Sequence, residues 1–211
     1  KPGVEEIFKE NPELASIGTE QQYSQYLETI IPGGELAYHG TDNENLKDVG
    51  FDINKNTRFN SGLGTNFFLE NGKTGQYGKE RISILYNPKN LLEFSPQGGT
   101  DKIEFSDEQV QKIMEYHNLV GKVSFKDYAE EIREKIYLHS FISSIVNKEG
   151  SNEKAAKVLI SLGIDGTKGD LLRVPVISIN NPNAMYILGS KEDIKGFKNF
   201  IGNQENNNSS E

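Results

Sequence analysis

The chain of 211 residues contains no cysteine and no tryptophan, only three histidines, and fewer basic than acidic side chains. Without cysteine, disulfides, cysteine-ligated zinc, iron–sulfur clusters and thiol nucleophiles are excluded. His39, His117 and His139 lie far apart in the sequence, so a histidine metal site would need long-range convergence, and we expect no metal. The net charge of −8, from 23 Lys and Arg against 31 Asp and Glu, disfavours a broad surface for nucleic-acid phosphates.

Long apolar segments are also missing. The sequence has no apolar run of 18 residues and no signal-peptide core, so we expect a cytoplasmic protein without a membrane span. It begins at Lys1 rather than Met, and we interpret it as part of a longer polypeptide. The tail 203–211 has no side chain that buries apolar area, which predicts disorder.

Hydrophobic periodicity and turn residues predict strands early and late in the chain with helices between them, which is typical of an α+β fold. Helices are expected to begin after capping residues; the candidates are Thr19, Ser106, Ser124 and Ser151. We predict helices at 4–14, 19–30, 106–119, 124–148, 151–162 and near 192–200, and strands at 36–38, 62–69, 82–86, 91–94, 174–179 and 185–188. Residues 42–61 are expected to be mostly loop, 71–78 a turn with a short helix, and 163–166 a turn.

The first informative motif follows the short strand at Leu36–Tyr38 and reads His39-Gly40-Thr41. This order places an imidazole at a strand end, where the backbone of Gly40 can approach a ligand because no Cβ intervenes. Taken alone, a histidine at a strand end more often has a structural role than a binding role.

The second motif reads Gly62-Leu-Gly64-Thr-Asn-Phe67-Phe68, with Tyr77 nine residues further on. The glycines permit a tight backbone, and the aromatic side chains form either a stacking surface or part of the core. It is not a dinucleotide-binding Gly-x-Gly-x-x-Gly motif, because Phe67 stands at the third glycine position, and no Walker Lys-Ser/Thr follows.

In this order, the two motifs resemble the ADP-ribosyltransferases of the diphtheria-toxin and poly(ADP-ribose) polymerase-like branch. The resemblance is closest to the domains within polyvalent proteins of phages and other mobile elements. It continues through Leu162–Gly166, Val176–Ser190 and Lys191–Phe197, and covers roughly residues 19–201, with 106–148 matching least.

The resemblance implies a split antiparallel β-sheet with an NAD+-binding cleft between its halves and a helical insertion at 106–162. We therefore expect one domain over 1–202, with N-terminal helices within 1–31. NAD+ would be the substrate. His39 would donate to a ribose hydroxyl as the catalytic residue, Gly40 would hold the nicotinamide carboxamide through its backbone, and Thr41 would join that contact.

The second motif would complete the pocket. Gly64 would contribute to cofactor binding, and Phe67 would stack on nicotinamide where the family usually has Tyr. Tyr77 would form the other side of an aromatic clamp.

The family's third motif is a carboxylate or Gln at the start of the late strand, where it stabilises the developing oxocarbenium ion. Counting back from Asn181-Pro182 places this position at Val176, or at Pro175 if the register slips by one. Three explanations stay open. The acceptor supplies the carboxylate; a local acid such as Glu70, Asp165 or Asp170 replaces it; or the chain is a degenerate member.

Other polar residues carry weaker signals. Arg58, in the loop over the expected cleft, and Arg173, before the late strand, are candidate phosphate contacts. The acidic residues at 101–108 fit a helix N-terminus, and the serines at 140, 143 and 144 lack a nucleophile elbow. His117 and His139 lie within predicted helices and fit structural roles.

The function expected from the resemblance is NAD+-dependent mono-ADP-ribosylation of a macromolecular target, a protein or nucleic acid, by a phage or mobile-element effector in a bacterial host. Two alternatives stay open. One is a catalytically degenerate module that acts by binding NAD+ or a protein, and the other is NAD+ hydrolysis without transfer.

Overall fold

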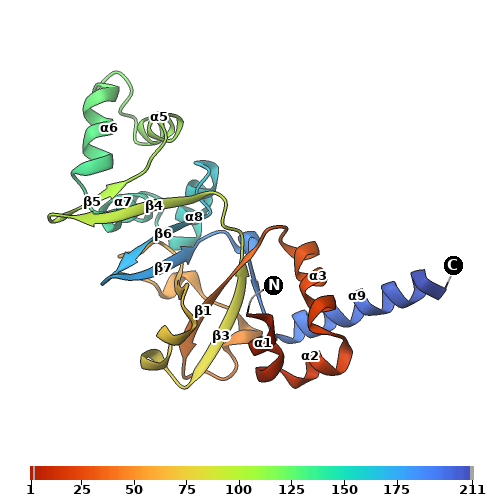
Figure 1. The fold of residues 1–211 in the computed structure, drawn as a ribbon. Coiled ribbons are helices and arrows are strands. Elements are labelled where there is room, and N and C mark those ends of the chain that lie inside the picture. Colours follow the sequence, from red (N-terminus) through yellow and green to blue (C-terminus); the bar gives the residue numbers. More distant parts are fainter. Residues whose placement is uncertain (2, 210–211) are drawn as a thin grey trace. The chain divides into compact units, whose positions relative to one another are not determined.

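The computed structural model describes residues 1 and 3–209 (Figure 1). Its residues group into two compact units. Unit 1 comprises residues 1–51, 70–88 and the chain from 183 onward, and unit 2 comprises 52–69 and 89–182. The single domain expected over 1–202 therefore stays a prediction.

Unit 1 combines an antiparallel sheet in the order β1-β3-β8 with a group of helices. The register of β1 on β3 runs from Glu35 opposite Tyr86 to Thr41 opposite Glu80. The elements are α1 (Val4–Glu10), α2 (Pro12–Ile17), α3 (Glu20–Ile30), β1 (Glu35–Thr41), α4 (Leu46–Val49), η2 (Asn71–Lys73), η3 (Gly75–Tyr77), β3 (Glu80–Tyr86), β8 (Met185–Ile187) and α9 (Lys191–Ser209).

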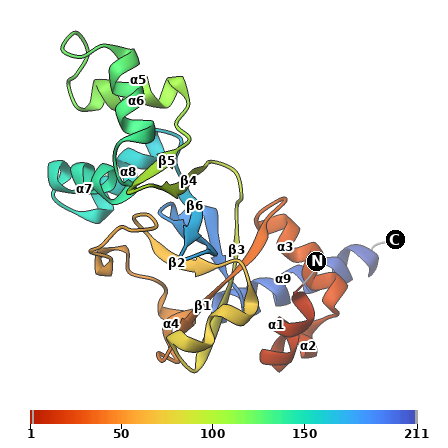
Figure 2. The same cartoon turned by 60° about the vertical axis from the view of Figure 1, so that its left-hand side comes forward.

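Unit 2 places a sheet in the order β5-β4-β6-β7-β2 against helices, of which α7 and α8 lie side by side (Figure 2). The β4–β6 pair is parallel, and the other strand pairs of this unit are antiparallel. The elements are η1 (Ile53–Lys55), β2 (Thr65–Phe68), β4 (Leu91–Gln97), β5 (Thr100–Ile103), α5 (Asp107–Tyr116), α6 (Phe125–Glu134), α7 (Leu138–Glu149), α8 (Asn152–Ser161), β6 (Gly166–Leu171) and β7 (Val174–Ile179). The short helix η4 (Pro182–Ala184) follows β7. The predicted α+β class, with mostly antiparallel strands, is confirmed.

The predicted helix starts are confirmed by their capping bonds. The hydroxyl of Thr19 accepts from the N–H of Gln22 at 3.1 Å, and the Gln22 side chain accepts from the Thr19 N–H. This reciprocal pair satisfies two backbone donors at the start of α3. The hydroxyls of Ser106, Ser124 and Ser151 make the equivalent bond to the N–H three residues later.

Two predicted helices are each broken once. The helix expected over 4–14 ends at Glu10, and α2 begins with Pro12, whose missing N–H suits a first helical position. The helix expected over 124–148 is interrupted at 135–137. There the Asp101 carboxylate accepts from the N–H of Leu138 at 2.6 Å, and the Asp101 N–H donates to the carbonyl of Ile136. These tertiary bonds replace the helical ones.

The tail prediction is wrong for the described residues, because α9 continues to Ser209 (Figure 1); residues 210 and 211 lie outside the described part. Phe197 and Ile201 are buried and hold the helix against unit 1. Once a helix is anchored, each further residue adds a hydrogen bond without a new nucleation cost, so polar residues extend it. In the described chain, no helix is both long and apolar enough to cross a membrane.

The core of each unit follows the predicted apolar stripes. In unit 1, the stripe of α3 packs against α9 and α1, and in unit 2, α5 to α8 bury their apolar faces against the sheet. The unit 1 core includes Ile7, Leu14, Tyr23, Leu27, Leu85 and Phe197, and the unit 2 core includes Leu92, Ile113, Ile132, Phe141, Ile145 and Leu159.

A buried carboxylate joins α9 to α3 within unit 1. Asp193 is fully buried, and its Oδ2 accepts from the Tyr23 hydroxyl at 2.5 Å and from the Gly189 N–H at 2.8 Å. Burial raises the pKa of Asp193 above its ordinary value, although these hydrogen bonds oppose the shift. Burial also raises the pKa of Tyr23, so the tyrosine stays a donor.

The stability of the protein is expected to carry a pH dependence from Asp193. Because the folded state retains a proton that the unfolded state releases near pH 3.8, the contribution of Asp193 is most favourable below that pH and declines as pH rises toward the folded pKa. Asp193→Asn removes this titration. Urea denaturation should show the wild type losing stability relative to the variant as the pH rises above 3.8, whereas a difference that is constant with pH would contradict the raised pKa.

Candidate functional site

The His39-Gly40-Thr41 motif forms the C-terminal end of β1. The carbonyl of Ser83 in β3 accepts a hydrogen bond from the N–H of Leu188, on the β8 side of the strand. The backbone N–H and C=O of Ser83 therefore point away from β1. Because these groups alternate along an antiparallel strand, those of Arg81, two residues away, also point away from β1. Arg81 is the register partner of Gly40. The backbone N–H and C=O of Gly40 therefore point away from β3, and the carboxamide contact stays a prediction.

Gly40 also permits the turn at η3 to approach β1. A Cβ at Gly40 would overlap the carbonyl oxygen of Thr74 and lie 3.1 Å from the Cβ of Tyr77. A Cβ at Gly78, which has a φ of +148°, would overlap the backbone of Thr41. Glycine at both positions allows backbone-to-backbone packing, and this packing places Tyr77 beside the motif.

The ring of Tyr77 lies at the surface, with 51% of the residue exposed. Its N–H donates to the carbonyl of Thr74 at 2.9 Å, which closes the η3 turn. The structure thus places Tyr77 next to Gly40 of the motif in unit 1, and the shared pocket stays a prediction.

The His39 ring is oriented by an aromatic neighbour that the sequence did not indicate. Phe51 meets it edge to face, with ring centroids 5.2 Å apart and an interplanar angle of 82°. Phe51 belongs to the apolar island within the loop expected at 42–61. An apolar residue in a polar loop was the available signal, but nothing in the sequence linked it to His39.

The segment after the motif is held by side-chain bonds to the backbone. The hydroxyl of Thr41 accepts from the N–H of Asn43 at 3.1 Å, and Asp42 Oδ1 accepts from the N–H of Lys79 at 3.0 Å. A hydroxyl retains its donor hydrogen when it accepts, so Thr41 can still donate to a carboxamide oxygen.

In unit 2, Gly64 lies where β2 meets β7. A Cβ there would overlap the carbonyl oxygen of Ile179, so the position requires glycine for strand packing. Asn56 reinforces this approach, since its Nδ2 donates to the carbonyls of Gly62, Leu63 and Gly64 at 3.0–3.1 Å. Gly64 therefore has a structural role, and its contribution to cofactor binding stays a prediction.

The two aromatic residues of the second motif are buried. Phe67 is 0% exposed and pairs with Ile177, and Phe68 is buried and pairs with Val176. The stacking of Phe67 on nicotinamide stays a prediction, and it requires that the ring be uncovered when a ligand binds.

The strand register places Val176 and Pro175, the two candidate positions of the third motif, on opposite faces of the sheet. Val176 is 0% exposed and lies opposite Phe68 and Gly169. Pro175 lies opposite Asp170. Paired residues share a face of the sheet and successive residues alternate, so Pro175 and Asp170 share the face of Ile177 and Phe67, whereas Val176 faces the other way.

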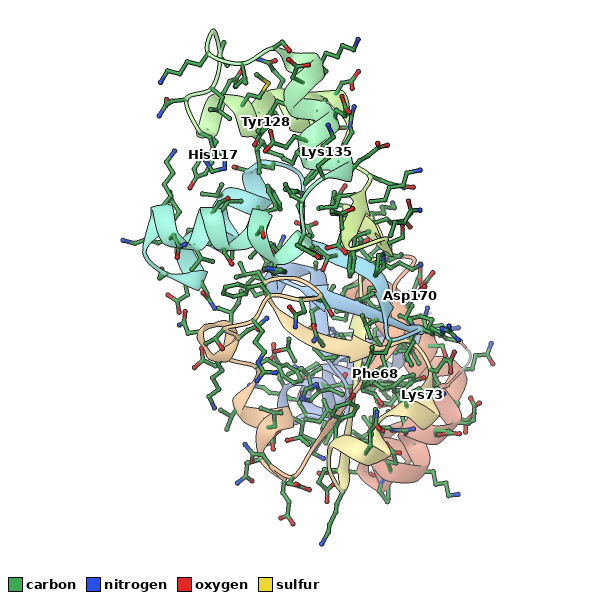
Figure 3. All side chains as sticks on the ribbon, turned by 90° about the vertical axis from the view of Figure 1, so that its left-hand side faces the viewer. Phe68, Lys73, His117, Tyr128, Lys135 and Asp170 are labelled. Carbon is green, nitrogen blue, oxygen red and sulfur yellow. The ribbon has the colours of Figure 1, made fainter. Side chains whose placement is uncertain are left out.

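The three candidate replacement acids differ in their surroundings. Asp165 is held in a turn, where its carboxylate accepts from Asn181 at 2.9 Å and from Asn90 at 3.4 Å. Glu70, in unit 1, forms an exposed ion pair with Lys73 at 3.9 Å. Asp170 makes no hydrogen bond or ion pair with any described residue, and it lies near the hairpin end of β6 (Figure 3).

Asp170 lines a small cavity of about 200 Å³ in unit 2. The lining is mixed in charge and consists of Glu93, Phe94, Ser95, Lys102, Glu104, Lys168, Gly169, Asp170 and Pro175. The carboxylate is therefore beside Pro175 and open to an incoming group.

The remaining histidines lie in unit 2. His117 ends α5, and burial together with the nearby Lys148 lowers its pKa below the ordinary value. His139 stacks on Tyr137 with ring centroids 5.1 Å apart. Within residues 1 and 3–209, no group of three or more His, Asp or Glu side chains is arranged to hold a metal ion.

Comparison of the chain with protein-family models, with curated proteins and with solved structures finds no match.

Proposed function

We propose that the protein is an NAD+-dependent mono-ADP-ribosyltransferase that modifies a macromolecular target. The observation that carries this proposal is the packing of Tyr77 beside His39-Gly40-Thr41 at the end of β1, through glycine contacts at 40 and 78. This arrangement combines a ribose donor, a backbone carboxamide contact and an exposed aromatic ring, which are the groups that hold nicotinamide and its ribose in the family that the sequence resembles.

The pocket groups have distinct tasks in this proposal. His39, oriented by Phe51, donates to a ribose hydroxyl. The N–H and C=O of Gly40, which point away from β3, bind the carboxamide, and the Thr41 hydroxyl adds a donor. Fixing the amide prevents rotation of the nicotinamide ring, so the glycosidic bond is held in one orientation for cleavage.

In the reaction, the bond between ribose C1′ and the nicotinamide nitrogen breaks, and its electron pair leaves with nicotinamide. The cation that develops at the ribose is then attacked by a nucleophile of the acceptor, which loses a proton. A positive charge that develops at the ribose is stabilised by a carboxylate. Of the three candidate acids, Asp170 is the one that makes no hydrogen bond or ion pair with a described residue, so we select it as the acid to test for this role.

Titration calorimetry with NAD+ tests the pocket. The wild type is expected to show saturable binding, and His39→Ala is expected to weaken it at least about 10-fold, as the loss of a ligand hydrogen bond implies. His139→Ala is the matched control, because it removes a histidine from unit 2, and it should leave the affinity unchanged. The absence of saturable binding by the wild type would exclude both an enzyme and a dinucleotide-binding module.

A second candidate function is a catalytically degenerate module that binds NAD+ or a protein. The complete burial of an aliphatic Val176 favours it, since no carboxylate stands at the expected third-motif residue. Incubation with tagged NAD+ and host lysate separates the candidates: a transferase labels protein or nucleic acid, a hydrolase releases nicotinamide without label, and a binding module does neither.

A further inference from the structure

A cavity of about 390 Å³ in unit 2 differs in charge from the three other cavities described for the molecule. In a chain of net charge −8, its lining contains two cations and no carboxylate. The three other cavities described each include at least two acidic side chains. The lining residues are Lys55, Asn56, Thr57, Arg58, Asn60, Ser61 and Asn66, in and beside the loop that leads into β2 (Figure 2).

The loop around this cavity has a fixed shape. Besides its three bonds to carbonyls, Asn56 accepts through Oδ1 from the N–H groups of Arg58 and Phe59. Asn152 Nδ2 donates to the carbonyls of Ile53 and Asn56 at 2.7 and 2.8 Å. Phe59 is buried in the unit 2 core with a φ of +56°. Two asparagines and one buried ring therefore hold the loop before any ligand binds.

The two cations are available to a ligand. Lys55 and Arg58 are exposed, and neither forms an ion pair with a described residue. By contrast, Arg81 and Arg133 contact carboxylates of their own units. Cations that lack intramolecular partners beside polar donors are suited to an anionic group, and the planar guanidinium favours phosphate oxygens.

Ser61 gives an independent indication of a ligand. The residue is 2% exposed, yet its Oγ has no hydrogen-bond partner in the described structure. Its carbonyl accepts from the Thr167 hydroxyl, which fixes the backbone to β6. A buried hydroxyl without a partner carries a desolvation cost, and an oxygen of a ligand in the cavity would satisfy it.

We infer that this cavity binds the diphosphate of a nucleotide ligand. Arg58 and Lys55 neutralise the phosphate charge, and the hydroxyls of Ser61 and Thr57 donate to its oxygens. The volume lies in the range of small-molecule sites and accommodates more than one phosphate group. The identification of NAD+ as the physiological source of this diphosphate rests on the proposed function, whereas the anion site rests on the cavity itself.

Calorimetric titrations with ADP, AMP and inorganic pyrophosphate test the inference. ADP and pyrophosphate are expected to bind the wild type. The affinity for AMP should be at least about 10-fold lower than the affinity for ADP. Arg58→Gln and Lys55→Gln should each lower the affinity for ADP about 10-fold, as the loss of a charge-assisted hydrogen bond implies. Lys157→Gln, on the exposed side of α8, is the matched control for charge.

Ser61→Ala separates a ligand contact from a structural role. Because Ser61 Oγ has no partner, the variant should keep the wild-type denaturation midpoint and still bind ADP several-fold more weakly. A wild type that binds neither ADP nor pyrophosphate overturns the inference.

The same titrations distinguish this inference from the proposed function. If Arg58→Gln weakens the affinity for ADP but the affinity for NAD+ does not depend on His39, the diphosphate site stands and the transferase proposal fails. If NAD+ binding depends on His39 while Arg58→Gln and Lys55→Gln leave ADP and NAD+ unaffected, the diphosphate site is overturned and the transferase proposal stands.

Discussion

Asp170→Asn is expected to lower the rate of NAD+-dependent ADP-ribose transfer by about 100- to 1000-fold, the range seen when one preorganised electrostatic contact is removed. The substitution keeps the shape of the side chain and removes its charge. In the proposed reaction the carboxylate stabilises charge that develops only in the transition state, so the affinity for NAD+ should stay within about threefold of wild type. Nicotinamide release and label transfer measure the rate, and calorimetry measures the affinity.

Glu104→Gln is the matched control for Asp170, because Glu104 is an exposed carboxylate that lines the same cavity. Its loss should leave the rate unchanged. Full activity in Asp170→Asn, with NAD+ bound as in the wild type, would exclude Asp170 as the stabilising carboxylate. Glu70, Asp165 or the acceptor would then supply the carboxylate, and a dependence of transfer on acceptors that contain one would identify the acceptor as the source.

Local signals predicted the helices better than the strands. The capping residues at 19, 106, 124 and 151 act through bonds to the third residue of their own helix, so the sequence contains both partners. Strand β6 was missed because Gly166-Thr-Lys-Gly-Asp-Leu171 has no apolar alternation. Its glycines instead permit close packing, since a Cβ at Gly169 would meet the ring of Phe94.

The break between α6 and α7 had no local signal, because its cause lies far away in the chain. Asp101, some 37 residues before Leu138, takes the hydrogen bond that a continuous helix would have used. The tail failed for a related reason. The tail is polar, but the anchor that extends α9 lies upstream at Phe197 and Ile201.

For the candidate site, the sequence supplied the residue types and the structure supplied their geometry. His39, Gly40 and Thr41 are adjacent in the chain, so their motif was visible directly. Asp170 was one of three acids under consideration, and only the pairing of β6 with β7 placed it opposite Pro175.

The diphosphate cavity shows what the sequence alone did not reveal. The sequence offers Arg58 as a candidate phosphate contact, but one arginine in a polar loop is not a specific signal. The loop acquires its shape from Asn56 and Asn152, which lie 96 residues apart. The absence of carboxylates from the lining is likewise a property of the folded loop rather than of a sequence window.

Phe197→Ala is expected to destabilise the protein by about 3–5 kcal/mol, the usual cost of truncating a fully buried phenylalanine. Phe197 is 0% exposed. Its ring meets Tyr23 edge to face with centroids 5.1 Å apart, and it lies 5.8 Å from the ring of Tyr26. The substitution opens a cavity between α9 and α3 and loses these ring contacts, so the free energy of unfolding in urea should fall.

Lys198→Ala, one residue further along the same helix and exposed, should change stability by less than about 0.5 kcal/mol. Hydrogen exchange adds a local test, because polar residues beyond 203 stay helical only while the anchor upstream holds. Phe197→Ala should therefore accelerate exchange of the amides at 203–209 far more than Lys198→Ala does. Equal exchange in the two variants would show that the end of α9 is helical without help from the unit 1 core.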